Sequence, residues 1–169
     1  MNEPKRLRNE FEWEAPGTQH PMSPMPKPPH PKETRRPLYW LVLAGENPSE
    51  LFFVNLTQDT LQVITTKSGG FETCDDDVLS FADDKGYAYR DILSGEAVKI
   101  EEFDGSYDLD RVFQVQLHVW SSSRGALRFV TATGKGTIPT HVLLWDSGEP
   151  GRQVSMTPID EVYNVSQYD

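Results

Sequence analysis

A strict alternation of apolar and polar residues in the middle of the chain limits what it can fold into. In the stretch RVFQVQLHVW, residues 111–120, apolar residues occupy every second position and polar residues lie between them. The apolar set is Phe113, Val115, Leu117 and Val119, and the polar set is Gln114, Gln116 and His118. A period of two residues places one set on each face of a β-strand, and no helix has this period. The stretch therefore predicts a strand with one buried face and one wet face.

Nine other segments have the length and composition of β-strands. Branched and aromatic residues are concentrated in them, and glycine, proline, asparagine, aspartate and serine separate them. They cover residues 38–43, 50–56, 59–66, 78–82, 87–92, 96–103, 126–132, 140–145 and 152–159, the last as an edge strand. No segment has a clear helical period, and residues 156–168 predict at most one short helical turn. This pattern predicts an all-β fold, an antiparallel sandwich.

Two stretches indicate which kind of sandwich to expect. In FFVNLTQDTL, residues 52–61, an asparagine ends a strand, and in LSGEAVKI, residues 93–100, a Gly-Glu turn opens one. In these features, which are common among sandwiches, the chain resembles bacterial immunoglobulin-like domains. The resemblance implies an immunoglobulin-like β-sandwich and assigns no function to any residue.

The first 37 residues differ in character from the rest. Nine of the 13 prolines lie there, at positions 4, 16, 21, 24, 26, 28, 29, 31 and 37. Because proline lacks an amide hydrogen and favours extended backbone, we predict a disordered proline-rich leader at 1–37, a β-sandwich at 38–160 and a tail at 161–169. The candidate partner-binding residues of the leader are Trp13, as an anchor, and Pro26, Pro29 and Pro31, as contacts for an aromatic groove.

The chain is acidic, and its charge is unevenly distributed. The net charge is −10 and the pI is about 4.8. The leader has seven lysines and arginines against five glutamates, which leaves nine basic and 21 acidic residues in the remainder. This balance argues against a nucleic-acid partner and favours basic protein partners. An exposed edge strand would also permit a homodimer.

The N-terminus is charged and lacks the apolar core of a secretory signal, and no run of about 18 apolar residues occurs. We therefore expect a cytoplasmic protein that does not enter a membrane. Cys74, the single cysteine, precedes three aspartates, which disfavour a reactive thiolate. The glycosylation patterns at Asn55 and Asn164 are expected to arise by chance.

The segment EEFDGSYDLDR, residues 101–111, is a candidate calcium site. Asp104, Asp108 and Asp110 are its candidate ligands, because calcium is bound by several carboxylates on a flexible loop. An EF-hand loop counted from Asp104 would require glycine where Leu109 stands and glutamate where Val115 stands. The segment therefore favours an acidic turn between two strands, with an irregular calcium site as the alternative.

The other candidate sites depend on weaker patterns. His118 and His141 lie on predicted strands and lack a third ligand at metal-binding spacing. The sequence TGKGT, residues 133–137, does not have the spacing of a phosphate loop, and SSSRG, residues 121–125, is not a nucleophile elbow. Six aromatic residues would form a sugar-binding platform if their rings were exposed and coplanar: Tyr39, Trp40, Tyr87, Tyr89, Trp120 and Trp145.

These observations favour a non-enzymatic protein-interaction module, with no cofactor and with a partner that the sequence does not identify. Two alternatives stay open. One is a calcium- or carbohydrate-binding β-module, and the other is a small enzyme whose site is assembled across strands and is not visible as a motif.

Overall fold

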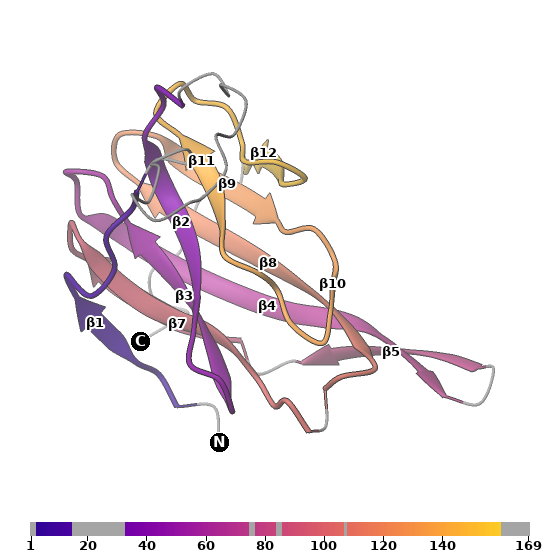
Figure 1. Cartoon of the computed structure of the whole chain (residues 1–169). Coiled ribbons are helices and arrows are strands. Elements are labelled where there is room, and N and C mark those ends of the chain that lie inside the picture. The colour runs from indigo at the N-terminus through magenta and orange to yellow at the C-terminus, as the bar shows by residue number, and fades with distance from the viewer. Residues whose placement is uncertain (1–2, 15–32, 75–76, 84–85, 107, 160–169) are drawn as a thin grey trace, which may run out of the picture.

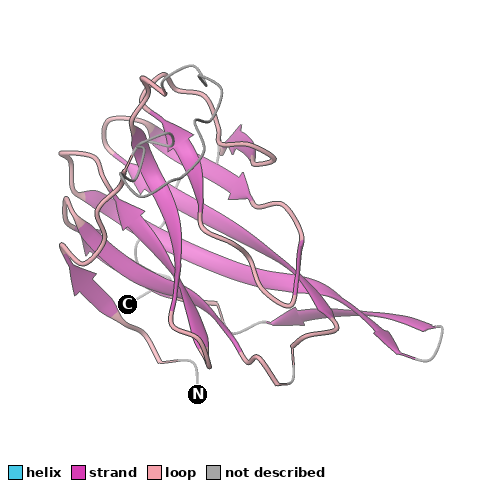
Figure 2. Cartoon of the chain, in the orientation of Figure 1, coloured by secondary structure: helices cyan, strands magenta, loops and turns pink. Residues whose placement is uncertain are grey.

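The structure is a computed structural model that describes residues 3–14, 33–74, 77–83, 86–106 and 108–159, with the backbone alone for residues 68–74 and 77–83. All regular elements in these residues are β-strands, and no helix occurs among them (Figure 2). The all-β prediction is therefore confirmed. In the part of the chain that the structure describes, no helix has the length and hydrophobicity needed to cross a lipid bilayer.

The strands form two antiparallel sheets that lie in two layers (Figure 1). Sheet A has the order β1-β7-β3-β2-β11. Its strands are β1 (Arg6–Arg8), β7 (Glu96–Phe103), β3 (Ser49–Asn55), β2 (Pro37–Ala44) and β11 (His141–Trp145).

Sheet B has the order β12-β9-β8-β4-β5, with β10 beside β8 and β6 beside β4. Its strands are β12 (Ser155–Pro158), β9 (Gly125–Val130), β8 (Arg111–Ser121), β4 (Leu61–Cys74), β5 (Asp77–Asp83), β10 (Gly134–Lys135) and β6 (Ala88–Ile92). The predicted edge strand near the C-terminal end is confirmed as β12, which pairs with β9 alone among the described strands.

Strand β4 is longer than the sequence predicts. We expected it to end at residue 66 because Ser68, Gly69 and Gly70 have the composition of a turn. Instead, the backbone continues to Cys74 and pairs with β8 on one side and with β5 on the other. Hydrogen bonds on both sides hold a strand together even where glycine contributes no side chain. The resulting β4–β5 hairpin projects from the body of the molecule (Figure 1).

The core fills the space between the sheets. The four apolar residues of β8 at positions 113, 115, 117 and 119 are all buried in it, so the alternation read from the sequence is confirmed. Aromatic pairs join the layers: Tyr39 of β2 meets Phe129 of β9 at 5.7 Å between ring centroids, and Phe103 of β7 meets Phe113 of β8 at 4.9 Å. Edge-to-face contacts of this kind add to the free energy gained from burial.

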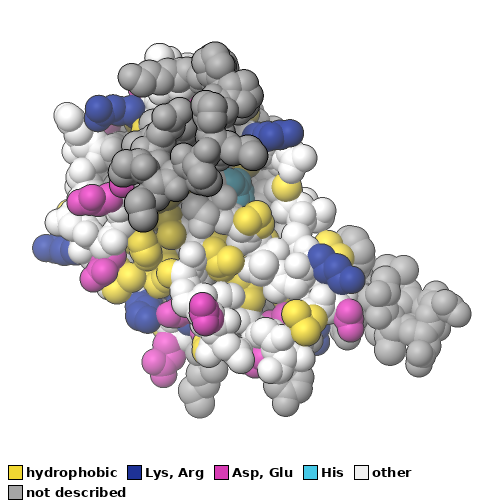
Figure 3. Space-filling model, in the orientation of Figure 1, with side chains coloured by type: hydrophobic (Ala, Val, Ile, Leu, Met, Phe, Trp, Pro, Cys, Tyr) yellow, Lys and Arg dark blue, Asp and Glu magenta, His cyan; other side chains and the backbone are white. Residues whose placement is uncertain are grey.

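The predicted flexible leader is wrong for its first part. Residues 6–8 form β1, which pairs with β7 at the edge of sheet A. Leu7 and Phe11 pack on a second apolar cluster, made of Val42, Phe52, Val54 and Ala97 on the outer face of this sheet. Figure 3 shows apolar side chains gathered in the middle of the visible face, with charged side chains around them. These apolar contacts attach the segment to the sandwich. Pro26, Pro29, Pro31 and the tail at 161–169 lie outside the described residues.

Candidate functional site

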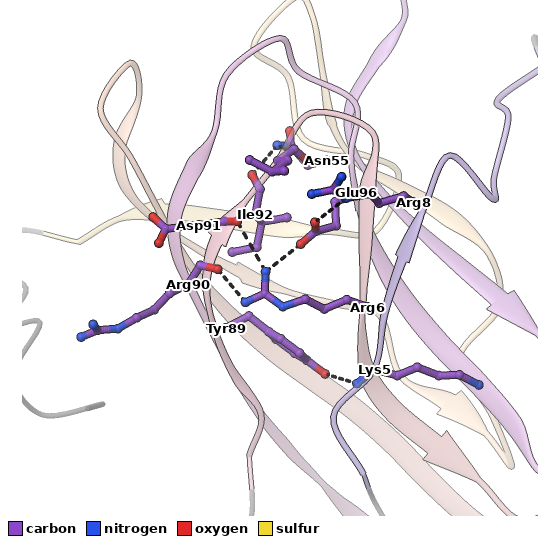
Figure 4. A network of polar contacts seen from close by, with 10 residues as sticks. Lys5, Arg6, Arg8, Asn55, Tyr89, Arg90, Asp91, Ile92 and Glu96 are labelled. Atoms are coloured by element: carbon purple, nitrogen blue, oxygen red, sulfur yellow. Dashed lines mark hydrogen bonds and ion pairs between the residues drawn. The ribbon is translucent and has the colours of Figure 1, made fainter.

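Arg6 ties the N-terminal segment to both sheets (Figure 4). Its guanidinium contacts the buried carboxylate of Glu96 at 2.7 Å and donates to the carbonyl oxygens of Arg90 at 2.6 Å and Asp91 at 3.4 Å. It also lies over the Tyr89 ring, 5.5 Å from the centroid. Glu96 belongs to sheet A, and the other three residues belong to β6 of sheet B. One side chain therefore closes this edge of the sandwich.

Tyr89 extends the same network. Its hydroxyl donates to the carbonyl oxygen of Lys99 at 2.6 Å. The same hydroxyl accepts from the backbone amide of Lys5 at 3.2 Å (Figure 4). Burial raises the pKa of Tyr89 above its ordinary value. The N-terminal segment is thus held by a backbone ladder, an ion pair and a buried hydroxyl.

Lys99 lies at the centre of a second charged group on β7. Its ammonium contacts Glu102 and lies 3.2 Å from Glu50, which Lys5 also contacts at 3.0 Å. Burial acts to lower the pKa of Lys99, but hydrogen bonds to Glu102 and Glu50 outweigh it and raise that pKa. Burial acts to raise the pKa of Glu50, but hydrogen bonds from Lys5 and Lys99 lower it. Both shifts favour the charged forms of Lys99 and Glu50, so these ion pairs stabilise the fold.

Trp13, the predicted anchor, packs on the sandwich. Its ring meets Trp145 edge to face, with centroids 6.1 Å apart. Arg35 lies over the Trp145 ring, 4.4 Å from its centroid, and contacts Glu33 and Glu149. Trp13 is half-buried by this contact. Its role in partner binding stays a prediction.

The acidic turn uses its carboxylates within the loop. The carboxylate of Asp108 accepts from the Asp104 amide at 2.6 Å and lies 3.6 Å from Arg111, and that of Asp104 accepts from the Ser106 amide at 2.8 Å. The structure thus brings Asp104 and Asp108 together and shows no contact of Asp110 with them. No group of three or more histidine, cysteine, aspartate or glutamate side chains among the described residues is placed to hold a metal ion.

The two strand histidines lie in different sheets. His118 is on β8, where its Nε2 lies 3.1 Å from the Gln116 amide nitrogen. His141 is on β11, where its Nδ1 lies 2.7 Å from the Pro139 carbonyl oxygen and burial lowers its pKa. His118 and His141 therefore do not form a shared metal site, which would have required their strands to lie side by side.

The aromatic residues do not form a sugar-binding platform. Tyr39, Tyr87 and Tyr89 are buried, and the three tryptophans at 40, 120 and 145 are half-buried. Trp145 lies between Trp13 and Arg35, whereas Trp120 meets His118 edge to face, with centroids 5.7 Å apart. The parallel pair among these six residues, Tyr87 and Tyr89, lies in the core.

The outer face of sheet B is the surface that sequence reasoning missed. The register places Thr65 of β4, His118 of β8, Arg128 of β9 and Thr157 of β12 in one row across four strands. A neighbouring row holds Lys67, Gln116, Val130 and Ser155. Lys67 and Arg128 are exposed, and His118 and Gln116 are half-buried.

Basic residues outnumber acidic ones among the side chains that the structure describes on sheet B strands. Among the side chains described on sheet B strands, the bases are Lys67, Arg90, Arg111, Arg128 and Lys135, and the single acid is Asp91. Sheet A strands carry four acids, at positions 50, 96, 101 and 102, and three bases, at positions 6, 8 and 99. The alternation at 111–120 predicted a polar face, but the bases come from separate strands whose pairing the sequence does not specify. Comparison with protein-family models, with curated protein sequences and with solved structures finds no match for this chain.

Proposed function

We propose that the protein is a non-enzymatic interaction module that binds a partner protein through the outer face of sheet B. The observation that carries the proposal is the contrast between the two outer faces. The outer face of sheet A holds an apolar cluster against which the chain's own Leu7 and Phe11 pack. The outer face of sheet B presents exposed bases beside a half-buried tryptophan and histidine. Tryptophan and arginine are enriched where proteins bind one another.

We also propose that the sandwich is of the immunoglobulin type, as the sequence resemblance implied. The strand order supports this assignment. Strands β2, β3 and β7 are adjacent in sheet A in the way that strands A, B and E are in immunoglobulin domains. Strands β4, β8 and β9 correspond in the same way to C, F and G, and β6 lies beside β4 as the extra strand C′ does. In this correspondence the proposed binding face belongs to the sheet that contains C, F and G.

The proline-rich segment is the competing location for partner binding. Pro26, Pro29 and Pro31 have the spacing that aromatic grooves recognise, which arises easily in a proline-dense tract. The calcium alternative has less support, because the Asp104 and Asp108 carboxylates already bind amide hydrogens of the loop. The carbohydrate alternative lacks exposed, coplanar rings among the described aromatic residues.

Affinity capture from the soluble lysate of the source organism tests the proposal. The full chain is compared with K67E/R128E, which reverses the charge of two exposed bases on this face. It is also compared with R36E/R152E, which makes the same change of net charge at exposed positions elsewhere. A third variant replaces Pro26, Pro29 and Pro31 with alanine. The proposal expects a partner that the wild type and R36E/R152E retain and K67E/R128E loses. A partner lost from the proline variant alone would assign binding to the leader and contradict the proposal.

A further inference from the structure

We propose that the outer face of sheet B binds an extended acidic segment of another protein, with carboxylates four residues apart. The inference rests on the proposed function and names its ligand class. It depends on three properties of the face: its charge, the spacing of its exposed bases, and the aromatic residues beside them.

The charge of the face selects an anionic ligand. Lys67, Arg128 and Lys135 are exposed on three different strands, and β8 and β9, which form the centre of the sheet beside β4, contain no acid. Charges interact over about 8 Å at physiological ionic strength. A segment lying on sheet B therefore feels these bases and is screened from the acids of sheet A. Because this attraction acts over a short range, an anionic segment can bind the exposed bases although the whole chain has a net charge of −10.

The spacing of the bases selects the spacing of the carboxylates. Lys67 pairs with Gln116, and Arg128 pairs with His118, so the two bases lie two strands apart and one two-residue step along the sheet. With strands about 4.8 Å apart and two residues spanning about 6.8 Å, their Cα positions are separated by about 12 Å. Residues i and i+4 of an extended chain are about 13 Å apart on the same side. One carboxylate of such a segment would contact Lys67 and the next Arg128.

The residues between the two bases suit the middle of the segment. Gln116 and His118 lie between Lys67 and Arg128 in the register, and Trp120 is the next outward residue on β8. The half-buried ring of Trp120 offers apolar surface. The exposed Gln114 donates one amide hydrogen to the Thr131 carbonyl oxygen and has a second to offer. An apolar or aromatic residue at i+2 of the segment would pack here while the flanking carboxylates pair with the bases.

A single-stranded nucleic acid fits this face less well. Such ligands bind on aromatic rings that stack with successive bases. The rings of Trp120 and His118 meet at 73°, so they do not offer a common stacking plane. A long polyanion would also extend beyond the face toward the acidic remainder of the chain. A second copy of the same face would bring like charges together.

Fluorescence anisotropy with a labelled peptide of sequence GSETYTESG tests the inference. Its glutamates are four apart with a tyrosine between them, and GSQTYTQSG is the neutral control peptide. We expect the acidic peptide to bind the wild type and R36E/R152E alike, and to bind K67E/R128E at least about tenfold more weakly. The neutral peptide should bind the wild type more weakly by a similar factor. The milder K67Q/R128Q should lie between the two, and thermal melting checks that all variants fold.

Three results would overturn the inference: no binding of the acidic peptide at about 1 mM, equal binding by both charge-reversal variants, or tighter binding of an oligothymidylate that depends on Lys67 and Arg128. The last result would assign the face to nucleic acid. If the lysate partner is lost from K67E/R128E while the peptide fails to bind, the proposed function survives and the ligand class is wrong. If both fail, the binding face itself is wrong.

Discussion

Tyr87 and Tyr89 stack in the core with ring planes 6° apart and centroids 6.1 Å apart, yet their hydroxyl groups differ in their hydrogen bonding. The Tyr89 hydroxyl has two partners, the Lys99 carbonyl oxygen and the Lys5 amide. The buried Tyr87 hydroxyl has no hydrogen-bond partner among the residues that the structure describes. Burial, with the charge of Glu101, raises the pKa of Tyr87. The hydroxyl groups of these two neighbouring tyrosines should therefore have opposite effects on stability: that of Tyr89 stabilises the fold, and that of Tyr87 destabilises it.

Removing each hydroxyl should change stability in opposite directions. Tyr87→Phe removes an unsatisfied buried group and should leave the free energy of unfolding unchanged or raise it by about 1 kcal/mol. Tyr89→Phe removes two hydrogen bonds and orphans the Lys99 carbonyl, so it should lower that free energy by about 2 kcal/mol. Urea unfolding monitored by fluorescence measures both. Equal losses in the two variants would show that the Tyr87 hydroxyl has a partner.

Arg6→Ala should destabilise the protein by about 2 kcal/mol, because it leaves the buried Glu96 carboxylate without its closest cation and frees two carbonyl oxygens. Arg8→Ala is the control, since Arg8 is largely exposed and lies 3.7 Å from the same carboxylate. It should cost less than about 0.5 kcal/mol. Hydrogen exchange of the Ala97 and Lys99 amides, which face β1, should also accelerate in Arg6→Ala. Unchanged exchange would mean that β1 stays paired without the arginine.

Asn55→Ala should cost about 3 kcal/mol, because the buried amide joins three parts of the chain. Its nitrogen donates to the carbonyl oxygens of Asp59, Ile92 and Leu93, and its oxygen accepts from the amide and hydroxyl of Thr57. Thermal melting compares it with Asn47→Ala, whose exposed side chain accepts one bond from Gly105. A small effect at both positions would contradict this role. Since Asn55 is fully buried, its glycosylation pattern is inaccessible in the folded protein.

The charged group around Lys99 should limit stability at both ends of the pH range. The pKa of Glu50 is lowered from 4.5, so its contribution is present above that value and is lost as the pH falls through the lowered pKa. The pKa of Lys99 is raised from 10.5, so its contribution is present below that value and is lost as the pH rises through the raised pKa. Melting temperatures from pH 2 to 12 measure both limbs. In Glu50→Gln the acid limb should become shallower; an identical acid limb would show that other carboxylates cause it.

Calcium should leave the wild type unchanged, whereas Asp108→Asn should destabilise it by about 1 kcal/mol. The Asp108 carboxylate accepts the Asp104 amide and lies near Arg111, so it has a structural partner without a metal. The melting temperature of the wild type in EDTA is compared with that in millimolar calcium. Asp110→Asn, at an exposed position, is the control for Asp108→Asn. A rise of several degrees with calcium in the wild type, absent in Asp108→Asn, would restore the calcium site.

Period-two alternation predicted the strands well because it reports burial directly. Strand β8 has both faces as expected, and β7 has the predicted bounds and buries Val98 and Ile100 as expected. Strict alternation would place Glu101 on the face opposite Ile100, but Glu101 is buried, because a bulge near Leu51 and Phe52 shifts the register of β7. A bulge changes which face a residue occupies, and its position depends on the partner strand.

The N-terminal strand and the basic face escaped sequence reasoning for one physical reason. Arg6, Leu7 and Arg8 contain a single apolar residue, and their pairing with β7 depends on an edge that residues far along the chain provide. Lys67 and Arg128 become neighbours on one surface only through β8, which pairs with both strands. Local patterns predict which residues form strands, and the order of strands in a sheet decides which of them meet.

The position of β1 has a consequence for synthesis of the chain. Arg6 and Glu96 are 90 positions apart, so Arg6 leaves the ribosome long before its ion-pair partner exists. At about 5–20 residues per second, the delay is about 5–20 s. Throughout that interval the sandwich surface on which Leu7, Phe11 and Trp13 pack has not yet formed. The apolar side chains of the N-terminal segment are therefore exposed for several seconds during synthesis. A chaperone at the ribosomal exit tunnel would have time to bind them.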